Sequence, residues 1–227
     1  MTLGLEGRNV VITGGGGALG QAVVQAFVEA GAICHLPVHG GPAPESATSI
    51  KVTPGVDLSD ERAVEAFYAS LPSLAASVHL AGGFKAAPIE ATSRADLTHQ
   101  VETNLVTAFL CCREAVKVMR KSGGGRIVNT GSRVVELPAG GMVAYAASKA
   151  AVAALTRALA DEVKHDGIFV NAVLPSIIDT PANRAGMPKA NFDRWPKPAE
   201  VAQAILWLAS PENGLTSGAL IPVYGQA

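Results

Sequence analysis

The sequence predicts an α/β fold in which helices cover both faces of one doubly wound parallel β-sheet. Two observations support this fold class. Short β-branched and apolar runs alternate with helical patterns along the chain, an order that builds a parallel sheet between two helical layers. The 227 residues contain no internal repeat, low-complexity tract or linker, so we expect a single domain over residues 1–227.

Seven apolar runs are predicted to form the strands, because each is short and is bounded by turn residues. In chain order these strands lie within residues 9–13, 32–38, 50–59, 76–83, 126–132, 168–175 and 217–225.

Five segments with apolar residues at helical spacing are predicted to form the helices. The first ends at Gly31, the second follows Ser59 as its N-terminal cap, and the third stops before a run of glycines at 123–125. The helices cover residues 18–31, 61–71, 94–121, 145–167 and 200–210.

Two connections depart from the alternation of strands and helices. Residues 39–49 are rich in Gly, Pro and Ser and are predicted to form a loop where the order would place another helix. Residues 176–198 are rich in proline but lie within the alternating order. We therefore interpret them as a substrate-side loop over a site.

The composition argues against several classes of function. A net charge of −1 with 16% charged residues gives no basic surface for nucleic acid or for an anionic membrane. No stretch approaches the roughly 20 apolar residues of a membrane helix, and the first residues lack a secretory signal. Three cysteines without a repeated spacing favour a reducing, cytoplasmic location, and the five histidines do not form a metal-ligand pattern.

A glycine-rich turn follows the first strand and opens the first helix. Gly15, Gly17 and Gly20 match GxGxxG in the strand–turn–helix context of a Rossmann-like dinucleotide-binding fold. Glycines there allow a pyrophosphate to approach the N–H groups at the start of the helix. A P-loop is excluded because Gln21 stands where a lysine is required. The predicted contacts in this turn are Gly14, Gly15, Gly17, Ala18, Leu19 and Gly20.

The end of the second strand should contain the residue that reads the adenosine ribose. Here Val38 and His39 precede two glycines, with neither an acid that would favour NAD nor an Arg or Lys that would favour NADP. The cofactor is therefore predicted to be NAD or NADP without a preference.

Ser132, Tyr145 and Lys149 form the pattern that points to chemistry. Tyr145 and Lys149 are four residues apart and share one face of a helix. A phenol titrates near pH ~10, and a neighbouring ammonium is expected to lower its pKa toward neutral pH. Ser132 ends a predicted buried strand, from which its hydroxyl could bind the substrate oxygen that the phenol protonates.

Together these motifs resemble the short-chain dehydrogenase/reductase family over essentially the whole chain. Matching pieces are the glycine turn, Asp57-Leu58, the segment from Ala81 through Gly82 to Gly83, and the set Asn104, Ser132, Tyr145, Lys149 and Pro175.

The resemblance implies a role for each matching residue. Tyr145 would be the general acid or base, Ser132 would orient the carbonyl or hydroxyl, and Asn104 would support a water-linked proton path. Lys149 would hold the nicotinamide ribose and lower the phenol's pKa. The remaining cofactor contacts implied are Val38, His39, Asp57, Leu58, Ala81, Gly82, Gly83, Asn104, Tyr145, Lys149, Pro175, Ile178 and Thr180. The family's long helices also imply a homodimer or homotetramer.

Several positions differ from the family pattern. Ala18 replaces the middle glycine of the loop, and His79-Leu80 replaces two asparagines before Ala81. Ser176 follows Pro175 where the family usually has glycine. The loop GGGGALG, the AGGF segment and residues 180–195 are also similar to the dihydropteridine reductase branch, although the acid that this branch uses for NADH is absent.

The sequence thus predicts an NAD(P)-dependent oxidoreductase that transfers a hydride between nicotinamide and a small carbonyl or alcohol. The alternatives are a dihydropteridine-reductase-like reductase of a quinonoid substrate and a non-catalytic dinucleotide-binding regulator. A Ser-Lys acyl hydrolase is disfavoured because position 146, three residues before Lys149, is Ala.

Overall fold

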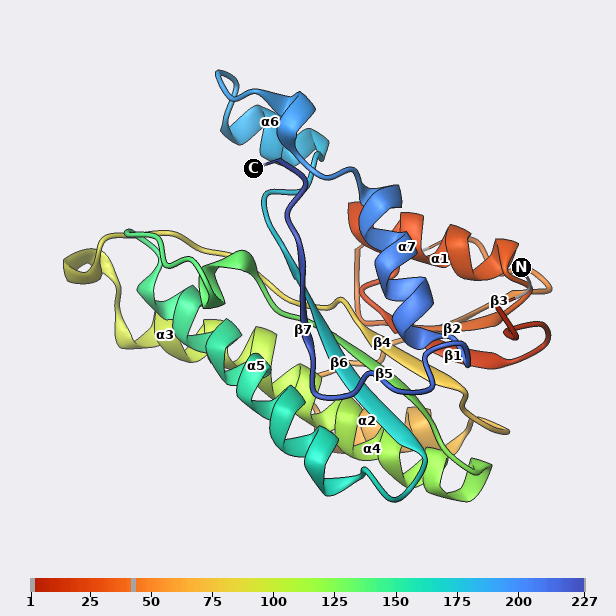
Figure 1. Cartoon of the computed structure of the whole chain (residues 1–227). Helices are drawn as coiled ribbons and strands as arrows, with labels where there is room; N and C mark the ends of the chain where they lie inside the picture. The colour runs from red at the N-terminus through yellow and green to blue at the C-terminus, as the bar shows by residue number, and fades with distance from the viewer. Residues whose placement is uncertain (1–2, 42–43, 227) are drawn as a thin grey trace.

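The computed structural model describes residues 3–41 and 44–226, which form a sheet with helices on both faces (Figure 1). All seven strands are parallel, in the order β3-β2-β1-β4-β5-β6-β7. The strand order reverses between β1 and β4, and ligands of such sheets bind at the carboxyl ends of the strands beside that point. The strands are β1 Asn9–Thr13, β2 Ile33–Val38, β3 Ile50–Pro54, β4 Ala76–His79, β5 Gly125–Thr130, β6 Ile168–Pro175 and β7 Leu220–Val223.

Alternate side chains of the strands build two separate cores. In β1, Val10 and Ile12 pack on the face covered by α1 and α7, whereas Val11 packs on the face covered by α2, α4 and α5. The predicted doubly wound α/β fold is therefore confirmed. The helices are α1 Ala18–Glu29, α2 Glu61–Ala69, α3 Arg94–Val101, α4 Thr107–Ser122, α5 Val143–Glu162, α6 Pro181–Gly186 and α7 Pro198–Ala209.

The connection between β2 and β3 contains no helix among its described residues, as the sequence predicted. Its described residues form bends and one isolated bridge, between Ala47 and Ile50. The absence of a helix leaves the end of β2 open beside the glycine turn, which matters for the site below.

The prediction that Ser59 caps the second helix is wrong. Asp60 is the cap, because its carboxylate accepts hydrogen bonds from the backbone N–H groups of Arg62 and Ala63. Ser59 instead donates its backbone N–H and its hydroxyl to Asp57, at 2.8 and 2.7 Å. Both residue types can cap a helix, and only the local backbone decides between neighbours.

The helix predicted over residues 94–121 is interrupted. A π-helical segment, Glu102–Val106, separates α3 from α4, and it places Asn104 in the protein interior. Such wide turns within helices are frequent at functional sites.

The segment predicted as a loop over residues 176–198 contains regular structure. Thr180 caps the short helix α6 by accepting the N–H of Asn183, and Pro181 occupies the first turn. A 3₁₀ turn follows at Phe192–Arg194 and leads into α7. This segment lies above the carboxyl ends of β6 and β7 (Figure 1).

A buried chain of hydrogen bonds crosses the sheet between β4 and β5. His79 bonds Ser77 through Nε2 and Asn129 through Nδ1, both at 2.8 Å, and Tyr68 and Thr156 continue the chain on either side. Burial lowers the pKa of His79 from 6.5 to about 4. His79 therefore stays neutral in the folded protein near neutral pH.

This lowered pKa predicts a specific loss of stability in acid. Between pH 6.5 and pH 4 the unfolded chain binds a proton that the folded His79 does not. The free energy of unfolding should therefore fall as pH falls through this window, by about 2–3 kcal/mol at pH 4.5 from this group. Urea unfolding at pH 7 and pH 4.5 measures the loss. A His79→Asn variant lacks the titrating group, so its loss of stability between pH 7 and pH 4.5 should be smaller than that of the wild type by about 2–3 kcal/mol. Equal losses in the two proteins would contradict the lowered pKa of His79.

Candidate active site

The turn between β1 and α1 is packed too closely for side chains at two of its glycines. A Cβ at Gly20 would lie 2.1 Å from the Gly14 carbonyl oxygen, and a Cβ at Gly14 would lie 2.8 Å from the Ala81 nitrogen. Gly17 caps α1 without a side-chain hydrogen bond, and a Cβ there would meet only the Gly14 oxygen, at 3.4 Å. The N–H groups of the first turn are thus free to bind an anion, which fits the pyrophosphate of a dinucleotide.

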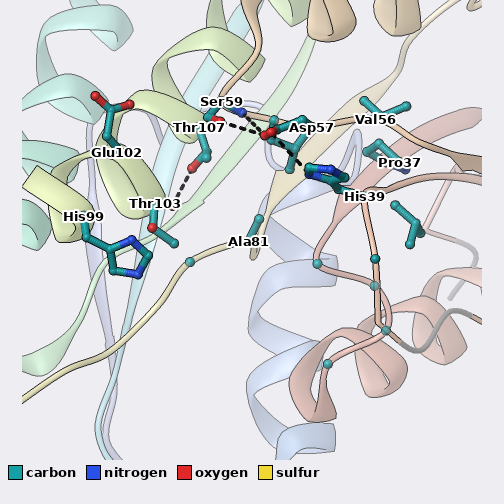
Figure 2. Close-up of a pocket in the computed structure, with 18 residues that line it drawn as sticks. Pro37, His39, Val56, Asp57, Ser59, Ala81, His99, Glu102, Thr103 and Thr107 are labelled. Atoms are coloured by element: carbon teal, nitrogen blue, oxygen red, sulfur yellow. Dashed lines mark hydrogen bonds and ion pairs between the residues drawn. The ribbon is translucent and has the colours of Figure 1, made fainter.

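A cavity of about 510 Å³ opens beside this turn (Figure 2). It lies at the carboxyl ends of β1, β2 and β3, where the strand order predicts a ligand. Nine of the predicted cofactor residues line it: Gly14, Gly15, Gly17, Val38, His39, Asp57, Leu58, Ala81 and Gly82.

An ion pair stands at one wall of this cavity. His39 Nδ1 lies 3.3 Å from Asp57 Oδ2, so the residues that end β2 and follow β3 meet in space (Figure 2). Hydrogen bonds from Ser59 lower the pKa of Asp57, and the charge of His39 lowers it further. Asp57 is therefore an ionised carboxylate at neutral pH. Both side chains are largely exposed, at 65% and 41%, so the pair itself adds little stability.

The opposite wall of the cavity was not anticipated from the sequence. His99, Glu102 and Thr103 enter it from α3 and the π segment (Figure 2). Their spacing of three and four residues puts them on one helix face. The spacing alone does not show that this face lines the cavity. The other lining residues that sequence reasoning missed are Gly16, Pro37, Gly40, Val56, Ser59 and Thr107.

The predicted catalytic residues lie together near the carboxyl end of β5. Ser132 follows β5 in an extended conformation, and Tyr145 and Lys149 lie one turn apart on α5. The Ser132 hydroxyl is close enough to the Tyr145 phenol to lower the pKa of that phenol. Phe84 packs edge-on against the Tyr145 ring, with ring centroids 4.9 Å apart, while remaining 62% exposed. The phenol therefore lies between a hydroxyl and an exposed aromatic side chain.

Burial shapes the electrostatics of this group. The Lys149 ammonium is buried, donates to the Thr130 carbonyl at 2.9 Å and lies 5.9 Å from the centre of the Tyr145 ring. Burial lowers the pKa of Lys149 to about 8. Burial also raises the pKa of Tyr145, and only the Ser132 hydroxyl acts in the opposite direction. The expected lowering of the phenol's pKa by Lys149 is therefore not seen in this structure.

Asn104 holds the segment after β4 in place. Its side chain accepts the N–H of Gly83 and donates to the Gly83 carbonyl, at 3.1 and 3.0 Å, and it also donates to Ser148 on α5. A Cβ at Gly82 would lie 2.6 Å from Asn104 Oδ1 and 3.5 Å from Lys149 Nζ. Gly82 also lines the cavity, so the cavity and the catalytic side chains adjoin at this residue.

The other predicted cofactor residues lie outside the lining of this cavity. Ala18 and Leu19 form the first turn of α1, and Pro175 ends β6. Ile178 and Thr180 begin the segment after β6, where Ile178 accepts a hydrogen bond from Asn183. Their proposed contacts with the nicotinamide remain predictions.

Comparison with known proteins decides the family. The model of the short chain dehydrogenase family matches residues 8–190. The chain belongs to this family.

A curated relative agrees with this assignment, and solved structures share the fold. Galactitol 2-dehydrogenase from Rhizobium johnstonii is 35% identical over 96% of this chain and 94% of its own length. The crystal structure of Cj0485 dehydrogenase superposes with a TM-score of 0.90 at 22% identity, covering 99% of this chain and 95% of that one. The structure of ElxO with NADP bound gives 0.85 at 23% identity, covering 96% and 98%.

The chain is therefore an NAD(P)-dependent oxidoreductase, as the sequence predicted. Its narrower similarity to the dihydropteridine reductase branch stays a prediction. Within the described residues, no helix is long and apolar enough to cross a membrane. No three His, Cys, Asp or Glu side chains in that part of the chain are placed to hold a metal ion.

Proposed function

We propose that the protein interconverts a small carbonyl compound and its alcohol, with Tyr145 as the proton donor and acceptor. The observation that carries the proposal is the meeting of the dinucleotide cavity with the Ser132, Tyr145 and Lys149 group at Gly82. When bound, the nicotinamide cofactor supplies or accepts the hydride. The protein supplies position, a proton and electrostatic stabilisation.

In the reductive direction, Tyr145 donates its phenolic proton to the substrate oxygen as negative charge develops there. Ser132 lies beside the phenol and donates a second hydrogen bond to the same oxygen. The Lys149 ammonium lies 5.9 Å from the centre of the Tyr145 ring and next to Gly82, where it can donate hydrogen bonds to the cofactor. Asn104 keeps the segment after β4 in place for this arrangement.

The cofactor is proposed to be NAD in preference to NADP. The cavity is lined by the carboxyl side chains of Asp57 and Glu102, and by no Arg or Lys among its eighteen described lining residues. An added ribose phosphate at the end of β2 would meet the Asp57 carboxylate without the cation that normally neutralises the phosphate. The His39–Asp57 pair offers hydrogen-bonding groups to a neutral ribose instead.

Fluorescence titration of the purified protein with NADH and NADPH tests this preference. NADH should bind about tenfold more tightly than NADPH, because one repulsive contact between like charges lowers affinity by about this factor. A His39→Arg variant should reduce the difference, while a matched His39→Gln variant should keep it. Tighter binding of NADPH to the wild-type protein would contradict the proposal.

Three coarser features complete the proposed function. Residues 176–198 are proposed to form the substrate-side wall, because they lie above the ends of β6 and β7 (Figure 1). The protein is proposed to be a cytoplasmic homodimer or homotetramer, by analogy with its family and because its three cysteines are free and buried. Polyols and sugars should be tested as substrates, because one relative is named galactitol 2-dehydrogenase.

A further inference from the structure

Three buried side-chain atoms have no hydrogen-bond partner in the described part of the chain: Oγ1 of Thr130, Nε of Arg133 and the phenolic oxygen of Tyr224. The last two belong to charged or polar side chains that face each other. The Arg133 guanidinium lies 5.8 Å from the centre of the Tyr224 ring, so the two groups are neighbours. Buried donors without acceptors are costly and rare in native proteins, and each such group calls for a partner.

The two residues follow strands whose carboxyl ends lie at the same edge of the sheet. Arg133 directly follows Ser132 and begins a 3₁₀ turn after β5, and Tyr224 directly follows β7. The Tyr224 carbonyl accepts the hydroxyl of Ser176, and the nearby Gln226 donates its N–H to the Arg194 carbonyl, at 2.8 and 2.9 Å. Ligands of open parallel sheets bind outside the carboxyl ends of the strands, which is the edge where both residues lie.

The charges identify the kind of group that would bind there. Arg133 makes no ion pair within 4.0 Å in the described residues, whereas Arg184 in the substrate-side segment is neutralised by Asp179. A guanidinium N–H and a phenolic O–H are both donors and together match a carboxylate. Burial and then the charge of Glu136 raise the pKa of Tyr224, while Arg133 lowers it, so the phenol keeps its proton at neutral pH and can act as a donor.

We propose that Arg133 and Tyr224 bind a carboxylate carried by the substrate, so that the protein prefers keto acids and hydroxy acids over neutral analogues. This inference rests on the proposed function, because it places the carboxylate next to the carbonyl-binding Ser132. It assigns a role to Arg133 and Tyr224 in substrate selection, separate from proton transfer by Tyr145.

Calorimetric titration of the NAD⁺-loaded protein, which cannot reduce a ketone, with levulinate, a small keto acid, and with its methyl ester tests the proposal. The wild-type protein should bind the acid more tightly than the ester. Arg133→Gln should weaken levulinate binding by about 10- to 100-fold, the effect of losing a charged hydrogen bond, and leave ester binding unchanged. Tyr224→Phe should cause a smaller loss of the same selectivity.

Controls separate this role from structural effects. Arg62→Gln makes the same charge change at an exposed position in α2 and should bind both compounds like the wild type. If Arg133→Gln fails to fold, Arg133→Lys can be used in its place. Arg133→Lys retains the charge but not the planar donors, so its affinity for levulinate should be lower than that of the wild type but not lost.

Three outcomes would overturn the proposal: no selectivity for the acid in the wild-type protein, no binding of levulinate, or equal losses in the Arg133 and Arg62 variants. A change of oligomer mass in Arg133→Gln with unchanged selectivity would assign the guanidinium to a subunit contact and would also overturn it. Reduction of neutral ketones without selectivity for acids would leave the proposed function intact.

Discussion

Tyr145→Phe is expected to lower turnover by about 10²–10⁴-fold, the usual contribution of a positioned acid or base. The substitution removes the phenolic proton but keeps the ring that packs against Phe84. NADH affinity should stay close to that of the wild type, because the cavity of about 510 Å³ is lined by other residues. Steady-state turnover and NADH titration measure the two effects separately.

A matched control is available in Tyr68. This buried tyrosine bonds Ser77 at 2.8 Å, away from the site, so Tyr68→Phe should reduce stability while turnover per folded molecule stays near normal. If Tyr145→Phe instead retained near-normal turnover, another group would have to supply the proton and the assignment of Tyr145 would fail.

Gly20→Ala is expected to weaken cofactor binding most strongly among single small substitutions in the glycine turn. The new methyl group would lie 2.1 Å from the Gly14 oxygen and 2.7 Å from the Gly15 Cα, both backbone atoms. The turn must therefore move, at a cost of about 1–3 kcal/mol typical of overpacking, or roughly 10- to 100-fold in affinity for NADH.

Gly186→Ala serves as the control for this variant. No atom lies within 4 Å of a Cβ at Gly186, so this change should affect neither stability nor NADH affinity. Unchanged NADH affinity in the folded Gly20→Ala protein would show that the cofactor does not depend on the geometry of the turn.

The fold could be predicted from the sequence because its signals are local. Each apolar run specifies a strand on its own, although β3 and β7 are only partly buried. The glycine turn that follows the first run marks the start of a helix. The details that failed depend on local competition. Ser59 and Asp60 are both residue types that cap helices well, so the sequence does not decide between them. The π segment at Asn104 does not change the spacing of apolar residues, so the sequence does not predict it.

Parts of the site could not be predicted because they depend on distant residues. His39 and Asp57 were each identified, but their ion pair follows from the pairing of β2 with β3. His99 and Glu102 line the cavity only because α3 and the π segment pack beside it. The pKa of Tyr145 follows its burial, which the four-residue spacing to Lys149 does not reveal.

The central claim is that Tyr145 delivers a proton while a hydride moves between nicotinamide and a carbonyl carbon. A single-turnover experiment with NADH deuterated at C4 tests it most directly, using mass spectrometry of the alcohol formed from a panel of ketones, keto acids and sugars. The wild-type protein should place deuterium on the former carbonyl carbon, and Tyr145→Phe should do so about 10²–10⁴-fold more slowly with NADH still bound. Binding of NADH without deuterium transfer to any member of the panel would contradict the account and favour a non-catalytic dinucleotide-binding regulator.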